Sequence, residues 1–449
     1  MVASLSDHGA EETKTAIEAA HQALKGWRQT SVKERSKLLR KWYQLLVDHQ
    51  DDLALLMTRE QGKPLAEAKG EILYGANYIE WFAEEAKRIY GDTIAPPSQD
   101  RRIICIKQPV GVVASITPWN FPNAMIARKA GPALAAGCTF VAKPAAETPL
   151  SALAMAALAE EAGIPPGVFN VVVGSNSQAI GGEMTSNPLV RKVTFTGSTG
   201  VGKILIKQCA DTVKKTSMEL GGNAPFVVFD DADLEAAVNG AMASKFRNAG
   251  QTCICANRFL VQEGIYDDFV KALAAKVSEL KVGYGLEKGV TMGPLINDRA
   301  VNDVDGMVQD AIQKGGKALC GGKKSDRGFG FYEPTILTNV TKDMRVFREE
   351  IFGPVAPIFK FKTEEEAVAL ANDTEFGLAA YIYTSNVSRL FRVSEEVEYG
   401  IVGVNEGAVS NEMAPFGGVK ESGSGREGSK YGIEDYVEIK YMCLGGINP

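Results

Sequence analysis

The chain has 449 residues, of which 45% are hydrophobic and 23% charged, and its formal net charge is -6. This length predicts a folded protein of two or three domains, and the acidic balance excludes a chain-wide basic surface for nucleic acid or an acidic membrane. The seven cysteines are odd in number and lack metal-like pairing, which argues against a disulfide framework and against a metal site.

The first ninety residues have the pattern of amphipathic helices. Ser31 can cap a helix that has Glu34 three residues on. Apolar residues then recur at helical spacing at Leu38, Leu39, Trp42, Leu45 and Leu46. The acidic start lacks the apolar segment of a signal peptide, and no apolar run is long enough to cross a bilayer. We therefore expect a cytoplasmic protein.

Strands and helices are predicted to alternate after the prolines at 96–97. The expected elements are strands over 110–118, 138–144 and 168–174 and a helix over 126–137. A further helix opens at Thr148 and Pro149, with Thr148 as its N-cap, and ends at Gly163. This order predicts a doubly wound parallel sheet of the Rossmann type, which is the usual location of a dinucleotide site.

A glycine-rich turn, Gly197 to Gly202, joins the next predicted strand to a helix. It is not the GxGxxG fingerprint, and such a turn is often plain loop structure. Its position at a helix start would nevertheless let backbone N–H groups face a pyrophosphate. Both interpretations stay open from the local sequence.

Two cysteines, Cys253 and Cys255, stand one residue apart in NAGQTCICANR (248–258). A cysteine inside an intracellular protein is most often a small core residue, and that interpretation is favoured for Cys255. The neighbours of Cys253 are small or amide-bearing and form no apolar face of either helical or strand period. A chemical role for Cys253 is therefore indicated.

A catalytic base for such a thiol can be sought by elimination. The three histidines (His8, His21 and His49) all lie in the N-terminal helical region, so a Cys–His hydrolase and a histidine-ligated metal centre are disfavoured. A carboxylate is the remaining choice, and Glu219 ends a predicted strand just before two glycines. The alternative is that Glu219 is a solvated charge at a strand end.

Seven motifs occur in one order along most of the chain. They are ITPWNFP, KPAAETP, FTGSTGVG, MELGGNAP, NAGQTCICANR, EEIFGPV and PFGGVKESGSGREGSKYG. With them the chain resembles the NAD(P)-dependent aldehyde dehydrogenases. Within that family it is most similar to the succinate-semialdehyde dehydrogenases, through SKFRNAGQTCICANR, NDTEFGLAAYIY and REGSKYGIEDYVEIKYM.

The resemblance implies an α/β, aldehyde dehydrogenase-like fold of three parts. These are a Rossmann-type dinucleotide-binding domain (1–91 and 110–221), an α/β catalytic domain (222–431) and a small oligomerisation sheet (92–109 and 432–449). The sheet would join a neighbouring subunit, so a homotetramer or homodimer is expected. Family members usually begin several tens of residues earlier, so either the sequence is shortened or an edge of the cofactor domain is missing, and a mitochondrial location is the alternative if the N-terminus is incomplete.

The same resemblance implies the catalytic roles. Cys253 would add to the aldehyde carbon to form a thiohemiacetal, Asn120 would help hold the oxyanion, and Glu219 would activate the water that hydrolyses the thioester. The expected reaction is oxidation of succinate semialdehyde to succinate with reduction of NAD(P)+. The alternatives are glutarate semialdehyde, an uncharged aldehyde, or a non-catalytic dinucleotide-binding protein on the same fold.

Cofactor and substrate contacts are implied by the matched positions. The cofactor residues would be Trp119, Lys143, Ala146, Gly197, Ser198, Glu350 and Phe352, and those for a distal carboxylate would be Arg128, Arg247 and Ser410. An acidic residue three positions after Lys143 would repel a 2′-phosphate. The chain has Ala146 there, which favours NADP over NAD, although Glu147 is adjacent. For each arginine the alternative is a surface ion pair.

Cys255 has no assigned step in this reaction. Two cysteines one residue apart on a bent loop can approach the Cα separation that a disulfide requires. The sequence therefore predicts that peroxide joins Cys255 to Cys253 reversibly.

Overall fold

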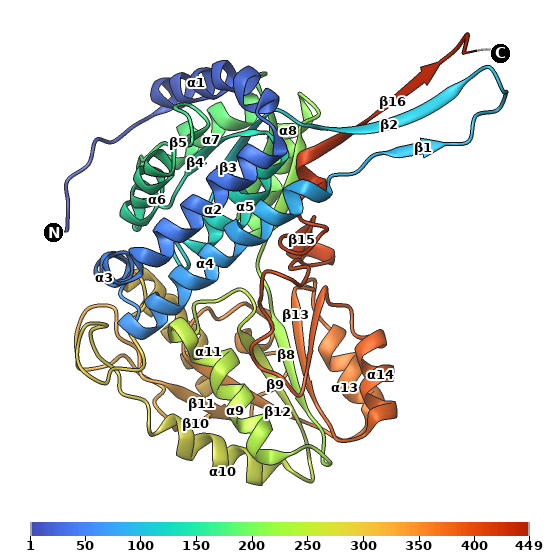
Figure 1. Ribbon diagram of the computed structural model, residues 1–449. Coiled ribbons are helices and arrows are strands. Elements are labelled where there is room, and N and C mark those ends of the chain that lie inside the picture. The colour runs from blue at the N-terminus through green and yellow to red at the C-terminus, as the bar shows by residue number, and fades with distance from the viewer. Residues whose placement is uncertain (1, 448–449) are drawn as a thin grey trace.

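The computed structural model describes residues 2–447, and three β-sheets organise them (Figure 1). No helix in this part of the chain is both long and apolar enough to cross a membrane. The N-terminal region is helical from Ala10 to Arg88, as predicted. Its helices are α1 (Ala10–Gln29), α2 (Val32–Asp48), α3 (Gln50–Gln61), α4 (Leu65–Glu85) and the short 3-10 helix η1 (Ala86–Arg88).

The first sheet follows the predicted alternation of strand and helix. Its strands, in spatial order, are β15 (Gly423–Ser424), β7 (Lys215–Glu219), β6 (Val190–Thr196), β3 (Val112–Ile116), β4 (Thr139–Lys143) and β5 (Phe169–Val171). All neighbours pair in parallel except β15, which pairs antiparallel to β7. The connecting helices are α5 (Ala124–Ala136), α6 (Pro149–Ala162), α7 (Ser177–Ser186) and α8 (Thr199–Ala210).

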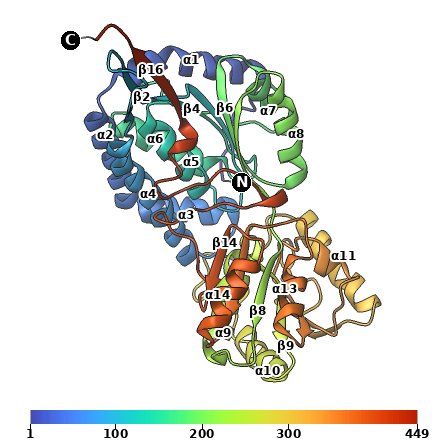
Figure 2. The ribbon, with the colours of Figure 1, turned by 90° about the vertical axis from the view of Figure 1, so that its right-hand side faces the viewer.

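Helices cover both faces of this sheet, as Figure 2 shows for α7 and α8 on one side and α2 and α6 on the other. Alternate residues of β3 divide between the two cores, with Val112 and Ala114 packing in one and Val113 in the other. Side chains of a strand alternate between its two faces, so a strand that is buried on both faces appears in the sequence as a continuous apolar run. The prediction of a doubly wound parallel sheet is thus confirmed.

The two predicted helix caps have different outcomes. Ser31 Oγ accepts a hydrogen bond from Glu34 N at 3.2 Å, as predicted. Thr148 is the N-cap residue of α6, as predicted, but its hydroxyl makes no cap hydrogen bond. The carboxylate of Glu60 in α3 instead accepts from Leu150 N at 2.8 Å and Ser151 N at 2.9 Å. A carboxylate from another helix satisfies these free donors, which local sequence cannot reveal.

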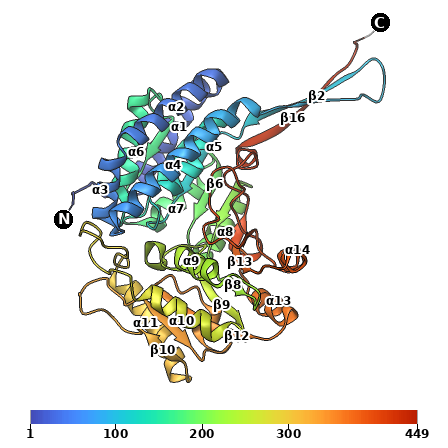
Figure 3. The same ribbon diagram turned by 60° about the horizontal axis from the view of Figure 1, so that its bottom comes forward.

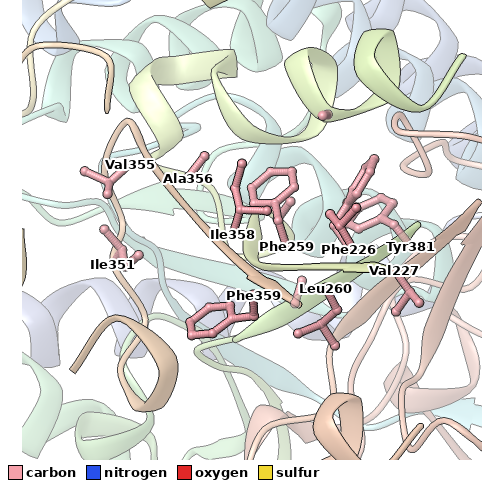
Figure 4. Close-up of a cluster of buried hydrophobic side chains, with 14 of the residues drawn as sticks. Phe226, Val227, Phe259, Leu260, Ile351, Val355, Ala356, Ile358, Phe359 and Tyr381 are labelled. Carbon is pink, nitrogen blue, oxygen red and sulfur yellow. The ribbon is translucent and has the colours of Figure 1, made fainter. Parts of the chain in front are cut away.

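The second sheet lies in the lower half of Figure 1 and has seven strands. In spatial order they are β10 (Lys317–Cys320), β11 (Thr335–Thr338), β12 (Val355–Phe361), β9 (Ala256–Gln262), β8 (Ala224–Val228), β13 (Ala379–Tyr383) and β14 (Ile401–Val404). The helices around it are α9 (Leu234–Lys245), α10 (Tyr266–Val277), α11 (Asp298–Gln313), α12 (Arg345–Arg348), α13 (Glu364–Asn372) and α14 (Val387–Glu396). Aromatic residues of its central strands pack together, with the Phe226 ring 5.1 Å from that of Phe259 and 5.8 Å from that of Tyr381 (Figure 4).

The third sheet is a projecting arm formed by β1 (Asp92–Ile94), β2 (Arg102–Pro109) and β16 (Val437–Leu444), in that order. All its pairs are antiparallel. In Figures 1 and 3, β2 and β16 run side by side away from the body. Ile439 and Tyr441 on the outer strand are 71% and 60% exposed, so the arm presents an uncovered strand edge with apolar side chains.

Candidate active site

Cys253 lies in the loop between the 3-10 helix η2 (Arg247–Gly250) and strand β9. Cys255 N donates to Thr252 O at 2.9 Å, which makes this loop a tight turn. The backbone after β7 passes so close that a Cβ on Gly222 would lie 2.4 Å from Cys253 O. Only glycine permits this approach, which explains one of the two glycines that follow Glu219.

Two cavities meet at Cys253. The first cavity has a volume of about 230 Å³ and the second about 20 Å³, and Cys253 lines both. The other residues of the first cavity are Pro118, Trp119, Asn120, Thr196, Gly197, Ser198, Leu220, Gly221, Glu350 and Phe352. The other residues of the second cavity are Tyr74, Phe121, Met125, Arg128, Arg247, Thr252, Ile254, Ser410 and Phe416. The structure therefore brings most of the sequence-predicted site residues to one thiol.

The first cavity is formed where the carboxyl ends of β3, β6 and β7 meet. Gly197 and Ser198 follow β6, and Ser198 is the N-cap residue of the twelve-residue helix α8. Its side chain makes no cap hydrogen bond, so the first N–H groups of α8 are available to an anion. Trp119 and Phe352 pack edge to face across the cavity, 5.6 Å between ring centroids. This combination of a helix N-terminus and aromatic walls fits a dinucleotide.

Lys143 and Ala146 lie outside the walls of the first cavity, at the carboxyl end of the adjacent strand β4. Lys143 is buried, its Nζ donates to Pro144 O at 3.0 Å, and burial lowers its pKa. Ala146 and Glu147 are both exposed. Because β4 neighbours β3 in the sheet, a dinucleotide that starts beside Cys253 could extend across both strand ends.

Glu350 stands in the wall of the first cavity, facing the chain that follows β7. Its Oε1 accepts a hydrogen bond from Gly222 N at 3.1 Å. Burial raises the pKa of this carboxyl to about 8. It therefore holds its proton near neutral pH until a donor such as a sugar hydroxyl compensates the charge.

The second cavity holds both predicted arginines, which differ in their surroundings. Arg128 is 1% exposed, ion-paired to Glu427 at 2.6 Å and stacked over the Phe416 ring at 3.8 Å. The alternative of a surface ion pair is therefore wrong for Arg128. Arg247 is exposed, lies over the Phe121 ring at 5.4 Å and makes no ion pair with the part of the chain that the structure describes. Both guanidinium groups therefore have donors to offer, since Arg128 Nε is buried without a hydrogen-bond partner among the described residues.

Ser410 reaches the second cavity from the loop after β14. Its hydroxyl is hydrogen-bonded to the Tyr74 hydroxyl, and Tyr74 in turn contacts the Tyr78 hydroxyl at 3.2 Å. Tyr78 OH donates to Asn411 O at 3.1 Å. Two tyrosines one helical turn apart on α4 therefore fasten the loop that carries Ser410.

Asn120 follows β3 and turns its side chain toward the cysteine loop. Its Nδ2 donates to Gln251 O at 3.0 Å, and its Oδ1 accepts from Phe121 N at 3.1 Å. An amide nitrogen carries two protons, so a second N–H remains for an oxygen in the first cavity. This is the donor that a developing oxyanion beside Cys253 requires.

Glu219 ends β7 and is 3% exposed, so the alternative of a solvated strand-end charge is wrong. Burial and the nearby Glu427 raise its pKa well above the usual range, against the opposing charges of Arg128 and Lys129. Burial also disfavours ionisation of Glu427, but Arg128 and Lys129 outweigh it and lower the pKa of Glu427. The pKa values of the two carboxyls are therefore shifted in opposite directions, as expected where two carboxyl groups interact in one buried site.

Comparison with known proteins decides the family. The model of the aldehyde dehydrogenase family matches residues 1–442. The chain belongs to this family. It is 64% identical to succinate-semialdehyde dehydrogenase [NADP(+)] GabD of Escherichia coli, over 98% of this chain and 92% of that protein. It is 63% identical to a glutarate-semialdehyde dehydrogenase of Pseudomonas aeruginosa, over 100% and 92% of the two chains.

A solved structure gives the same result for the fold of this aldehyde dehydrogenase. The crystal structure of succinate-semialdehyde dehydrogenase from Burkholderia pseudomallei superposes with a TM-score of 0.97 at 62% identity, over 98% of this chain and 91% of that one. The resemblance identified from the motifs is therefore confirmed, as is the aldehyde dehydrogenase-like fold.

Three residues that contact the site of this aldehyde dehydrogenase were not predicted from the sequence. Lys129 donates to both Thr196 Oγ1 and Glu427 Oε1, Glu427 contributes to the raised pKa of Glu219, and Tyr74 is hydrogen-bonded to Ser410. Lys129 directly follows Arg128, and Glu427 lies in the quoted motif SGSGREGSKYG. For Lys129 and Glu427 the only sequence signal is a charge inside an apolar helix or a glycine-rich loop, and these two partners lie 298 residues apart.

The two thiols differ in environment. Burial raises the pKa of Cys253 to about 12, although Arg128 opposes this. The Cys255 thiol is buried and donates to Lys245 O at 3.2 Å. All seven cysteines are free. Cys253 is the partly exposed member of the pair and faces both cavities.

Proposed function

We propose that this aldehyde dehydrogenase oxidises succinate semialdehyde to succinate and uses NADP as hydride acceptor. The observation that carries the proposal is the position of Cys253 in the wall of both cavities. A thiol there can bond to a carbonyl carbon in the second cavity while that carbon faces the first. The free guanidinium of Arg247 selects an aldehyde with an anionic far end.

The first step is addition of Cys253 Sγ to the aldehyde carbon. The carbonyl oxygen becomes an oxyanion, which the free N–H of Asn120 Nδ2 and the backbone N–H of Cys253 stabilise. The thiol must lose its proton first, and Arg128 is the cation of the chain that favours the thiolate. When bound, the nicotinamide supplies the acceptor for the hydride that leaves the carbon.

The second step releases the acid. Cys253 is left as a thioester, and Glu219 removes a proton from the water that attacks it, so that the C–S bond breaks and the thiol is regenerated. Because the pKa of Glu219 is raised, its carboxyl must be ionised before it can act as a base.

The preference for NADP rests on the end of β4. Ala146 places no carboxylate where it would repel a 2′-phosphate, and Lys143 is the cation beside it. Glu147 is exposed and turned to solvent. The GabD relative carries NADP(+) in its name, which agrees with this preference.

Glutarate semialdehyde is a second candidate substrate. It has the same terminal groups with one more methylene, and a relative named for it is 63% identical to the chain. One methylene in an apolar pocket changes binding by only about 1–3 kcal/mol. The two substrates must therefore be compared directly.

The decisive experiment follows NADP and NAD reduction with succinate semialdehyde, glutarate semialdehyde, acetaldehyde and a bulky aldehyde. We expect the highest kcat/KM with succinate semialdehyde and NADP. A preference for acetaldehyde would contradict the role of the arginines, and a preference for glutarate semialdehyde would replace the substrate while keeping the mechanism.

A homotetramer or homodimer is also proposed, on the basis of the projecting arm. The open edge of β16 and its exposed Ile439 and Tyr441 favour pairing with another copy of the chain. Light scattering of the purified protein would test this, and a monomer at micromolar concentration would refute it.

A further inference from the structure

Lys63 lies in the link between α3 and α4, outside the motifs that identify the family, and is only 2% exposed. Its ammonium group has three neighbours. It forms an ion pair with Glu71 at 2.5 Å, donates to Asn120 O at 2.8 Å and lies 4.1 Å from the centroid of the Phe121 ring. A buried cation therefore contacts the backbone of the residue that offers the oxyanion donor.

Glu71, the partner of Lys63, fixes the other end of the same segment. Its Oε1 accepts hydrogen bonds from Asn123 N at 3.0 Å and Ala124 N at 3.2 Å, at the start of helix α5. The Lys63–Glu71 pair thus holds the chain at residue 120 and again at residues 123–124. The orientation of the Asn120 side chain depends on the backbone between these points.

Asn248 provides a second donor to the same carbonyl. Its Nδ2 donates to Asn120 O at 3.0 Å, and its Oδ1 accepts from Gln61 Nε2 at 3.0 Å. Asn248 and Ala249 have φ of 52° and 54°, a left-handed conformation that costs free energy in non-glycine residues. The link at residues 61–63 therefore fastens both the Asn120 segment and the loop that leads to Cys253.

Such an arrangement is a poor choice for stability alone. Burying a lysine and a glutamate removes the hydration of two charges, and an apolar replacement of a buried pair is often neutral or stabilising. The charges of Lys63 and Glu71 do perform a function that an apolar pair could not, since a carbonyl oxygen and two N–H groups are held by them. A displacement of about 1 Å at a catalytic group can cost on the order of 100-fold in rate.

We propose that Lys63 is a positioning residue for the oxyanion donor Asn120, which it orients through the Asn120 carbonyl. This inference rests on the proposed function, because Asn120 has that role only in thiohemiacetal chemistry. Lys63 does not touch the reacting atoms, and its effect must therefore pass through Asn120.

Lys63→Met tests the proposal by a split between kcat and KM. We expect kcat to fall by roughly 10- to 100-fold with both succinate semialdehyde and acetaldehyde, with the dissociation constant of NADP unchanged. Lys192→Met is the matched control, since Lys192 is equally buried, bonded to Ser217 and 5.0 Å from the Tyr436 ring, away from Asn120. Its kcat should stay within about twofold of the parent.

Lys63 also lines a third cavity of about 240 Å³ together with Arg247 and Glu67. If Lys63 instead attracts anionic substrate through that cavity, Lys63→Met would raise KM for succinate semialdehyde alone. A KM effect confined to the anionic substrate would overturn the positioning role.

A double-mutant cycle tests directly whether Lys63 acts through Asn120. In an Asn120→Ala background, Lys63→Met should cost less than about twofold, because the group that it orients is absent. An equal fold-loss in the two backgrounds would overturn the proposal. Asn248→Gly removes the second donor to the Asn120 carbonyl, and glycine accepts the left-handed φ at this position. Its loss of kcat should likewise be smaller in the Asn120→Ala background. This variant keeps the proposal testable if Lys63→Met does not fold.

The outcomes separate this inference from the proposed function. If the parent protein oxidises none of the aldehydes, the proposed function fails. If the parent is active and Asn120→Ala loses activity while Lys63→Met and Asn248→Gly do not, only the positioning role of Lys63 fails.

Discussion

Replacement of Arg247 by alanine addresses substrate choice most directly. Arg247 lines the second and third cavities, is exposed, and makes no ion pair with the described residues. The Phe121 ring lies 5.4 Å from the guanidinium carbon, and the charge of Arg247 opposes the rise that burial causes in the pKa of Glu67 in the wall of the third cavity. Truncation at Arg247 breaks no ion pair with the described residues, so a difference between the anionic and the neutral aldehyde measures the interaction with substrate.

The expected rise in KM follows from the strength of a hydrogen bond to a charged group and from the exposure of Arg247. A hydrogen bond to a charged group contributes about 1.5–3 kcal/mol, which corresponds to roughly 13- to 160-fold in binding. Because solvent screens an exposed guanidinium, we expect a loss of binding at the low end of this range. Arg247→Ala should raise KM for succinate semialdehyde by about tenfold and change KM for acetaldehyde by less than about twofold.

The assay is steady-state NADP reduction with both aldehydes at a fixed, saturating NADP concentration. Arg128→Met is the informative contrast, because Arg128 is buried and paired to Glu427. Removing that cation raises the pKa values of Glu427 and Glu219, so kcat should fall with both aldehydes. The two variants thus distinguish substrate binding from control of the base.

Equal effects of Arg247→Ala on the two substrates would refute the reasoning, since they would make Arg247 a structural residue of the loop that leads to Cys253. A melting temperature of the variant within a few degrees of the parent would exclude unfolding as the cause of any loss.

The remaining predictions concern the base, the cofactor and the second thiol. Glu219→Gln should keep a first-turnover burst of NADPH in stopped-flow absorbance while steady-state turnover falls at least about 100-fold, and a lost burst with NADP still bound would give Glu219 an earlier role. Burial raises the pKa of Glu219, so its ionised fraction falls as the pH falls through that raised pKa. We therefore expect kcat of the parent enzyme to decline on the acid side. A pH profile without this decline would contradict the role of Glu219 as the base. Ala146→Glu should lower the ratio of kcat/KM for NADP over NAD by about tenfold or more, whereas Glu147→Gln, the control, should leave the ratio nearly unchanged. Peroxide should remove two hydrogens from the peptide that contains Cys253 and Cys255, reversibly with dithiothreitol; a Cys255→Ala enzyme that recovers as fully as the parent would leave Cys255 a packing residue only.

Strand alternation and motif order were readable from the sequence because both are local properties. The apolar runs that became β3, β4 and β6 needed only the neighbouring turns to be recognised. Motifs such as ITPWNFP and FTGSTGVG lie at the carboxyl ends of β3 and β6, and parallel strands bring these ends to one edge. The first cavity was therefore predictable in outline, through Trp119 and Ser198.

Charge states were not predictable in this way. Glu219 and Glu427 are adjacent only because β15 pairs with β7 and returns the C-terminal segment to the first sheet. The directions in which their two pKa values shift depend on Arg128 and Lys129 beside Glu427, and thus on distances across four segments of chain. The same holds for the start of α6, where the Glu60 carboxylate accepts from Leu150 N and Ser151 N while the Thr148 hydroxyl makes no cap hydrogen bond.

The sequence by itself determined the family and the alternating order of strands and helices, and it indicated Cys253 as the candidate nucleophile, since these depend on residue type and spacing along the chain. The tertiary structure alone decided that Cys253 borders two cavities, that Arg247 rather than Arg128 is free of an ion pair, and that Lys63 reaches the Asn120 carbonyl. The physical reason is that burial and electrostatic interactions act over a few ångströms in space, and the sequence separations here are 57 residues for Lys63 and Asn120 and 298 for Lys129 and Glu427.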